Sequence, residues 1–224
     1  MVVFVELDDW KAALKPERKI LEGLYARLEP LSADRHAQTL FEAAAAPGAQ
    51  DRFRYLSDYP PSAFSELRGW TEKAEASAGP LFFAVIDKAT GRAEGRQALM
   101  RVDTVHGAIE IGSIMWGPAI TRTRIATEAL FLLADHAFSL GYRRFEWKCD
   151  NANQPSMRAA ERFGFRFEGI FRQHMVVKGL NRDTAWYSIT DSEWPHLRAG
   201  YERWLQSDNF DSSGQQRRKL AFDL

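Results

Sequence analysis

The chain has one cysteine, no excess charge of either sign and no long apolar run. Its lone thiol, Cys149, cannot form an intrachain disulfide or build a cysteine-based cluster, so we predict a reducing environment and no metal. Lys plus Arg and Asp plus Glu number 30 each, which argues against a general nucleic-acid binder and predicts no nucleic-acid partner. No stretch approaches the roughly 20 apolar residues of a membrane span, and the apolar run at 1–5 is too short for a signal peptide. We therefore expect a soluble, cytoplasmic protein without a membrane partner.

Two nucleotide-binding motifs are also missing. The chain has no Gly-x-Gly-x-x-Gly after its first predicted strand and no Gly-x-x-x-x-Gly-Lys-Ser/Thr, which argues against a nucleotide-dependent oxidoreductase or kinase. What it does have is 45% hydrophobic and 12% aromatic residues, enough for a sizeable core and too many for an intrinsically disordered protein. The length of 224 residues fits one domain with an arm at each end. We predict an N-terminal arm at 1–20, one domain at 21–205 and a polar tail at 206–224.

The apolar pattern and the turn residues predict an α/β chain. Residues 21–31 alternate apolar and polar positions as a strand does, whereas apolar positions from Ile125 to Leu140 recur at helical spacing. The predicted strands are 21–31, 81–87, 92–103, 108–116, 144–149, 165–177 and 184–189. The predicted helices are 32–46 (capped by Ser32), 62–76, 123–140, 153–163 and 191–205. Three strands joined by turns, followed by strand–helix–strand crossovers, predict a mixed central sheet with helices on both faces.

Several short motifs resemble one enzyme family. Glu110-Ile111-Gly112, Trp116-Gly117-Pro118 and Thr127-Glu128-Ala129 look like the fourth strand and pyrophosphate loop of GNAT acetyltransferases, and Asn153-Gln154-Pro155-Ser156 with Arg162-Phe163-Gly164-Phe165 looks like their second cofactor motif. The resemblance covers roughly residues 20–190 and is strongest to the RimJ/RimL-like branch. It implies a GNAT fold with splayed fourth and fifth strands. It also implies transfer of an acetyl group from acetyl-CoA, the co-substrate, to a primary amine of a protein N-terminus or a small molecule, by direct attack in a ternary complex. A homodimer is one predicted assembly.

The resemblance places the cofactor pyrophosphate at the start of the helix predicted from residue 123. Backbone N–H groups and the helix dipole attract anions there. Family members usually carry a Gln or Arg, then any two residues, then Gly-x-Gly/Ala. In this chain Thr121 occupies the Gln/Arg position and Arg124 the first Gly position, and only Ala126 matches the motif. Arg122 and Arg124 are predicted to bond the phosphates, the alternative being a solvated first turn. The predicted cofactor-binding residues are Ile114, Met115, Trp116, Arg122, Thr123, Arg124, Ile125, Ala126, Thr127 and Asn153.

Two residues are the predicted catalytic groups. Glu110 is the only carboxylate on the strand 108–116, and the resemblance implies that it takes a proton from the amine; the alternative is an outward-facing strand residue. Many family members protonate the leaving thiolate with a Tyr, but Ala160 occupies that position. The RimL-like alternative is the hydroxyl of Ser156; the other interpretation of Ser156 is a cap or a solvated hydroxyl at the helix start, where Asn153 is the predicted cap.

Two further alternatives remain open at this stage. Cys149 is expected to pack as a small buried hydrophobic residue. The alternative is an acyl intermediate on its sulfur, but the sequence has no His at a fixed spacing from Cys149 to act as a base. The altered loop and the missing Tyr also leave open a catalytically silent acyl-CoA-binding module. Protein N-termini, polyamines, amino acids and amine antibiotics all remain open as the amine acceptor.

Overall fold

The structure is a computed structural model that describes residue 7 and residues 9–222; the first residues of the predicted N-terminal arm and the end of the predicted tail lie outside this part. The strands are β1 (Leu21–Glu22), β2 (Ala26–Pro30), β3 (Leu81–Asp87), β4 (Arg92–Asp103), β5 (Ala108–Trp116), β6 (Arg144–Asp150), β7 (Arg166–Val177) and β8 (Leu180–Thr190). The helices are α1 (Ala33–Ala45), α2 (Ala49–Phe53), α3 (Phe64–Glu75), α4 (Arg124–Ser139), α5 (Gln154–Arg162), α6 (Trp194–Trp204) and the short 3₁₀ turn η1 (Ser207–Asn209). None of these helices combines the length and the apolar character needed to cross a membrane.

All eight strands form one mixed sheet in the order β1-β2-β3-β4-β5-β6-β8-β7. Neighbours are antiparallel except β5 and β6, which are parallel and joined by α4. Residues Ala108–Ile111 of β5 pair with Arg144–Trp147 of β6, and beyond these residues the two strands separate. On the other side of β5 the register with β4 shifts after Gly112, where Ser113 has a φ of +51°. This bulge turns β5 away from β6. β5 and β6 are the predicted fourth and fifth strands, so the predicted α/β fold with these two strands splayed is confirmed.

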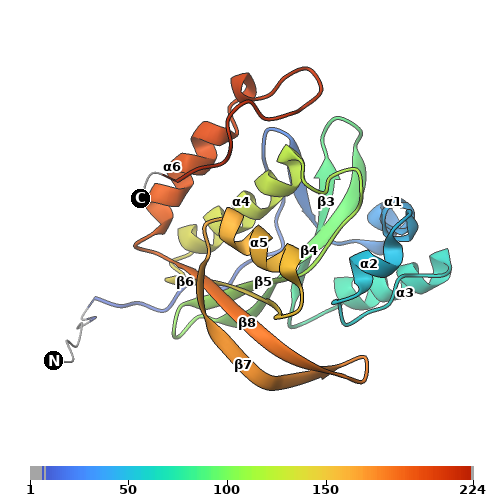
Figure 1. Ribbon diagram of the computed structural model, residues 1–224, viewed down its shortest axis with the longest axis horizontal. Coiled ribbons are helices and arrows are strands. Elements are labelled where there is room, and N and C mark those ends of the chain that lie inside the picture. Colours follow the sequence, from blue (N-terminus) through green and yellow to red (C-terminus); the bar gives the residue numbers. More distant parts are fainter. Residues whose placement is uncertain (1–6, 8, 223–224) are drawn as a thin grey trace.

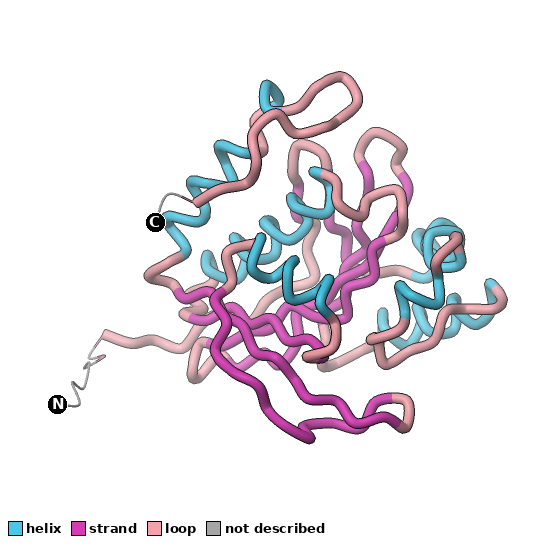
Figure 2. Tube along the Cα trace, in the orientation of Figure 1, coloured by secondary structure: helices cyan, strands magenta, loops and turns pink. Residues whose placement is uncertain are grey.

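The helices cover the two faces of the sheet separately, and alternate strand residues belong to the two resulting cores. On β3, Phe83 and Val85 pack into the larger core with α4, while Phe82 and Ala84 pack with α1–α3. Figure 1 shows α1–α3 grouped at one end of the molecule and α4 and α5 lying across the other part of the sheet. In Figure 2 the β7–β8 hairpin extends beyond the helices, which leaves a helix-free region of the sheet beside α2.

The predicted strand at 21–31 is wrong in one respect, because it is broken into β1 and β2 by a turn. The carboxylate of Glu128 on α4 accepts hydrogen bonds from the backbone N–H groups of Leu24 (2.7 Å), Tyr25 (2.6 Å) and Ala26 (2.6 Å). A Cβ at Gly23 would lie 2.4 Å from the Glu128 Cδ, so the turn and the carboxylate fit only with glycine there. A residue about a hundred positions away thus determines the local backbone.

Three other predictions differ from the structure, and one helix was not predicted. Ser32 precedes α1, but its side chain makes no capping bond; its N–H donates instead to His36 Nδ1 (3.0 Å). The short helix α2 was not predicted, and β8 begins at Leu180 rather than at Thr184 because the hairpin turn is tighter than expected. After α6, the segment predicted as a polar tail folds back, burying Phe210 and placing Phe222 against Tyr201, with ring centroids 5.3 Å apart.

Candidate active site

Two cavities meet where β5 and β6 separate. One, which we call the α4 cavity, has a volume of about 770 Å³ and lies between the N-terminal ends of α4 and α5 and the segment 213–216. The other, the hairpin cavity, has a volume of about 830 Å³ and lies between the α2–α3 connection and strands β6–β8. Five residues line both cavities: Ile114, Trp147, Asn153, Pro155 and Ser156. The gap between the splayed strands therefore connects a space on one face of the sheet with a space on the other.

The α4 cavity has a strongly cationic lining. It contains four arginines, Arg122, Arg124, Arg158 and Arg162, and no Asp or Glu among its described lining residues. Arg162 donates through Nη1 to Thr127 Oγ1 (3.1 Å), and burial lowers the pKa of its guanidinium. Several cationic groups side by side without a carboxylate partner favour an anionic ligand. The chemistry of this lining fits a phosphorylated molecule.

The start of α4 adds backbone donors to this cavity. Thr123 caps the helix, its Oγ1 accepting from the N–H of Ile125 (3.2 Å). Within residues 9–222 the N–H groups of Arg124 and Ala126 make no hydrogen bond. Arg124, at the position where the family usually has glycine, is the first helical residue, and its guanidinium stacks 4.1 Å from the centroid of the Tyr25 ring. The left-handed residue of the loop is instead Arg122, with a φ of +63°.

The predicted cofactor-binding residues are brought together with one exception. Nine line the α4 cavity: Ile114, Trp116, Arg122, Thr123, Arg124, Ile125, Ala126, Thr127 and Asn153. The side chain of Met115 does not line this cavity, because it is buried on the opposite face of β5, in the core with α1–α3. The sequence analysis missed Arg158 and Arg162, although their spacing of four places them on one face of α5. It also missed Phe210 and the segment 213–216, for which no sequence signal exists.

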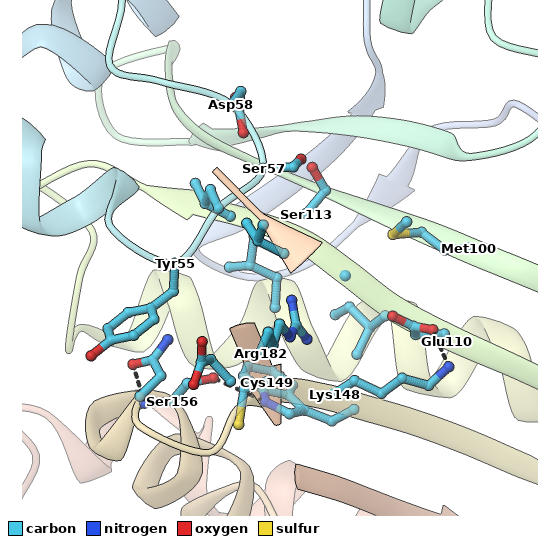
Figure 3. A pocket seen from close by; sticks show the side chains of 18 of the residues that line it. Tyr55, Ser57, Asp58, Met100, Glu110, Ser113, Lys148, Cys149, Ser156 and Arg182 are labelled. Atoms are coloured by element: carbon cyan, nitrogen blue, oxygen red, sulfur yellow. Dashed lines mark hydrogen bonds and ion pairs between the residues drawn. The ribbon is translucent and has the colours of Figure 1, made fainter. Parts of the chain in front are cut away.

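The hairpin cavity is bordered by ties between distant segments. Lys178 Nζ in the β7–β8 turn donates to the carbonyl oxygen of Phe53 (2.8 Å). The Tyr55 hydroxyl donates to the carbonyl oxygen of Ala152 (3.1 Å), just before α5. Asp58 forms an ion pair with the buried Arg96. Because of these contacts, the α2–α3 connection forms one wall of the cavity, and Figure 3 shows Tyr55 and Asp58 on that side.

Glu110 lies in the hairpin cavity, as Figure 3 shows, with only 6% of its surface exposed. Its Oε2 forms ion pairs with Lys148 Nζ (2.7 Å) and Arg101 Nε (2.9 Å), but the donor and acceptor groups are not oriented as in a hydrogen bond. In the described part of the chain, Oε1 has no such partner. It is directed toward Gly112, where a Cβ would be 3.2 Å away. The same Cβ would lie 2.6 Å from Met100 Sδ, so a side chain at position 112 would collide with the Met100 thioether.

Ser156 lies at the junction of the two cavities. Its Oγ accepts a hydrogen bond from Trp147 Nε1 (3.1 Å), which leaves the hydroxyl proton available for donation. Asn153 Oδ1 accepts from the N–H of Ser156 (3.2 Å), so the prediction that Asn153 caps α5 is confirmed. Ala160 is fully buried and has no polar group to offer.

Cys149 is buried beside Ser156, and burial raises the pKa of its thiol, with Ser156 and Arg182 acting in the opposite direction. A thiol with a raised pKa is a poor nucleophile at neutral pH. This environment fits the predicted packing role of Cys149 and gives no support to an acyl intermediate on its sulfur.

Comparisons with known proteins agree with this geometry. A family model described as an acetyltransferase (GNAT) domain matches residues 26–166. The crystal structure of a GCN5-related N-acetyltransferase from Brucella melitensis is 60% identical, with a TM-score of 0.94, covering 96% of this chain and 97% of that one. A probable GNAT acetyltransferase from Chromobacterium violaceum ATCC 12472 is 39% identical, with a TM-score of 0.80, covering 87% and 98%.

A curated relative, the uncharacterized N-acetyltransferase p20 of Bacillus licheniformis, is 30% identical over 117 residues. That match covers 50% of this chain and 63% of the relative, less than two thirds of its length. The family match at residues 26–166, by contrast, runs from β2 through α5 and includes both splayed strands. The chain belongs to the GNAT acetyltransferase family.

Proposed function

We propose that the protein transfers an acetyl group from acetyl-CoA to a primary amine by direct attack in a ternary complex. One observation carries the proposal: a cationic cavity and a mixed-charge cavity meet at the gap between β5 and β6. Members of the family generally use acetyl-CoA. A donor in one cavity and an acceptor in the other would meet at this gap without a covalent enzyme intermediate.

The α4 cavity is the proposed donor site. The N–H groups of Arg124 and Ala126, together with the guanidinium groups of Arg122, Arg158 and Arg162, are suited to the pyrophosphate and other phosphate groups. The edge of β5 facing β6 is unpaired after Ile111, so backbone groups in the segment 114–116 are available to the pantetheine arm. One N–H there would stabilise negative charge on the carbonyl oxygen as the amine attacks.

Proton transfers are assigned to Glu110 and Ser156. In this proposal Glu110 Oε1 takes a proton from the ammonium group, directly or through water, and the neutral nitrogen then attacks the carbonyl carbon. As the carbon–sulfur bond breaks, Ser156 donates its hydroxyl proton to the sulfur and regains one from solvent or from the amide being formed. Its contact with Trp147 Nε1 supports this role, because it orients the Ser156 oxygen at the junction.

The alternative is a silent acyl-CoA-binding module, which the absence of Tyr at position 160 favours. The two functions separate in a pair of measurements. Acetyl-CoA is expected to raise the melting temperature with the logarithm of its concentration in either case. Release of free thiol over a panel of amines, including peptides that begin with Ser or Ala, is expected only of an enzyme. No release with any amine would contradict catalysis, and no thermal shift up to millimolar acetyl-CoA would contradict both functions.

Membership of the RimJ/RimL-like branch stays a prediction.

A further inference from the structure

Arg182 on β8 differs from the other cations of the hairpin cavity. Its Nε donates to Thr184 Oγ1 (3.2 Å), and no carboxylate in the described part of the chain lies within ion-pairing distance of its guanidinium group. The side chain is only partly exposed and lines the cavity. Figure 3 shows it projecting among the labelled cavity residues. Its two terminal nitrogens are therefore free to bind a ligand.

The neighbouring cations already have partners. Lys148 and Arg101 contact Glu110. Arg52 donates to three backbone carbonyl oxygens. Arg54 is exposed and stacks on the ring of Tyr55. Only Arg182 combines partial burial with terminal donors that have no partner among the described residues, an arrangement that is unfavourable unless a ligand supplies an acceptor.

The position of Arg182 relates it to the junction of the cavities. Its charge acts on the thiol of Cys149, which lies beside Ser156. Across the cavity, Glu110 Oε1 is a free acceptor on β5. Glu110 Oε1 and the guanidinium fork of Arg182 are thus a free acceptor and a free donor group on different strands of the same sheet.

Building on the proposed function, we propose that Arg182 binds a carboxylate of the acceptor, and that the acceptor is a small aminocarboxylate whose ammonium group faces Glu110. A planar guanidinium fork matches a carboxylate in two parallel hydrogen bonds. A phosphate would bring a second negative charge toward the acids of the cavity, Asp51, Asp58, Glu110 and Asp150. At a protein N-terminus the α-carboxylate is consumed in the peptide bond, so such a substrate lacks the group that Arg182 would recognise.

The proposal is tested by binding, without turnover. Calorimetry with the full-length protein and saturating CoA would compare glycine, L-alanine, L-serine, 3-aminopropanoate, 4-aminobutanoate and 6-aminohexanoate with their amides. At least one acid is expected to bind about 10- to 100-fold more tightly than its amide. Arg182→Ala should remove this preference and Arg182→Lys restore only part of it, because an ammonium group lacks the fork. Arg172→Ala, an exposed arginine on the adjacent strand, should retain it.

Two outcomes would overturn the proposal. Acids and amides binding alike, or none binding, would show that no carboxylate is recognised. An equal loss for both ligands in Arg182→Ala would make Arg182 a structural residue; if that variant does not fold, Arg182→Gln and Arg182→Lys give the same comparison. Turnover of other amines together with a negative binding result would refute this inference alone. Carboxylate binding without thiol release with any amine would refute catalysis alone.

Discussion

The two cavities that meet at the gap between β5 and β6 differ in how far their cationic side chains are paired with acceptors of the protein itself. In the α4 cavity the arginines have no acidic neighbours among the described lining residues, whereas in the hairpin cavity most cations are already paired with Glu110 or with backbone carbonyls. An unpaired cationic lining suits a polyanion, because the ligand supplies all of the negative charge. A paired lining leaves few free groups, and those few select the ligand. The comparison predicts that changes in the first cavity alter donor binding, and changes in the second alter turnover.

The largest expected effect concerns the wall of the α4 cavity. Glu128→Ala would leave three N–H groups of the β1–β2 turn, one buried and two partly buried, without an acceptor and loosen Tyr25, on which Arg124 stacks. We expect the free energy of unfolding to fall by about 3–5 kcal/mol, measured by chemical denaturation. Asp135→Ala on the same helix removes an exposed ion pair and should cost less than about 1 kcal/mol. Similar values for the two variants would contradict the role given to Glu128.

The second prediction tests the donor side directly. Arg158→Ala combined with Arg162→Ala should weaken acetyl-CoA binding by about 3 kcal/mol, and Arg122→Ala combined with Arg124→Ala by about 1–3 kcal/mol, because phosphate contacts are lost. Calorimetry at two salt concentrations would measure both the affinity and its reduced salt dependence. Arg54→Ala, at the hairpin cavity, serves as the matched control and should bind acetyl-CoA as the wild type does. Unchanged acetyl-CoA affinity in the double variants would contradict the assignment of the α4 cavity as the donor site.

The third prediction tests the acceptor side through Glu110. Glu110→Gln should lower kcat/KM about 100-fold at neutral pH, since the ammonium group loses its proton acceptor. The defect should shrink as the pH rises, because a growing fraction of the amine arrives neutral. Glu146→Gln is the control, as it removes an acid 3.4 Å from the same Lys148 but outside the cavity lining. A loss that does not change with pH would assign Glu110 to holding β5 against Lys148.

The smallest expected effect lies at the junction of the cavities. Ser156→Ala should lower kcat about tenfold, the equivalent of one hydrogen bond that strengthens as charge develops on sulfur. Acetyl-CoA affinity should stay within about twofold of the wild type. Ser139→Ala, which removes a hydroxyl bonded only within its own helix end, should leave kcat unchanged. If Ser156→Ala changes stability alone, its hydroxyl merely supports Trp147.

Much of the architecture follows from local sequence. The strands at 81–87, 92–103 and 108–116 and the cap Asn153 lie where turn residues and periodicity predict them. Periodicity is a local property, since a strand or helix that must bury one face repeats its apolar residues accordingly. The family resemblance also names Glu110 and Ser156 as candidates, and their catalytic roles stay predictions.

What only the tertiary structure decided is which of these groups remain free. The pairing of Glu110 Oε2 with Lys148 and Arg101, the stacking of Arg124 on Tyr25 and the unpaired fork of Arg182 all join residues from different elements. The break between β1 and β2 likewise depends on Glu128, on the helix that follows β5 in the chain. Sequence patterns specify which face of an element is buried, but the partner of a polar atom depends on which elements pack together. The charge available to a ligand is therefore set by the fold and not by composition.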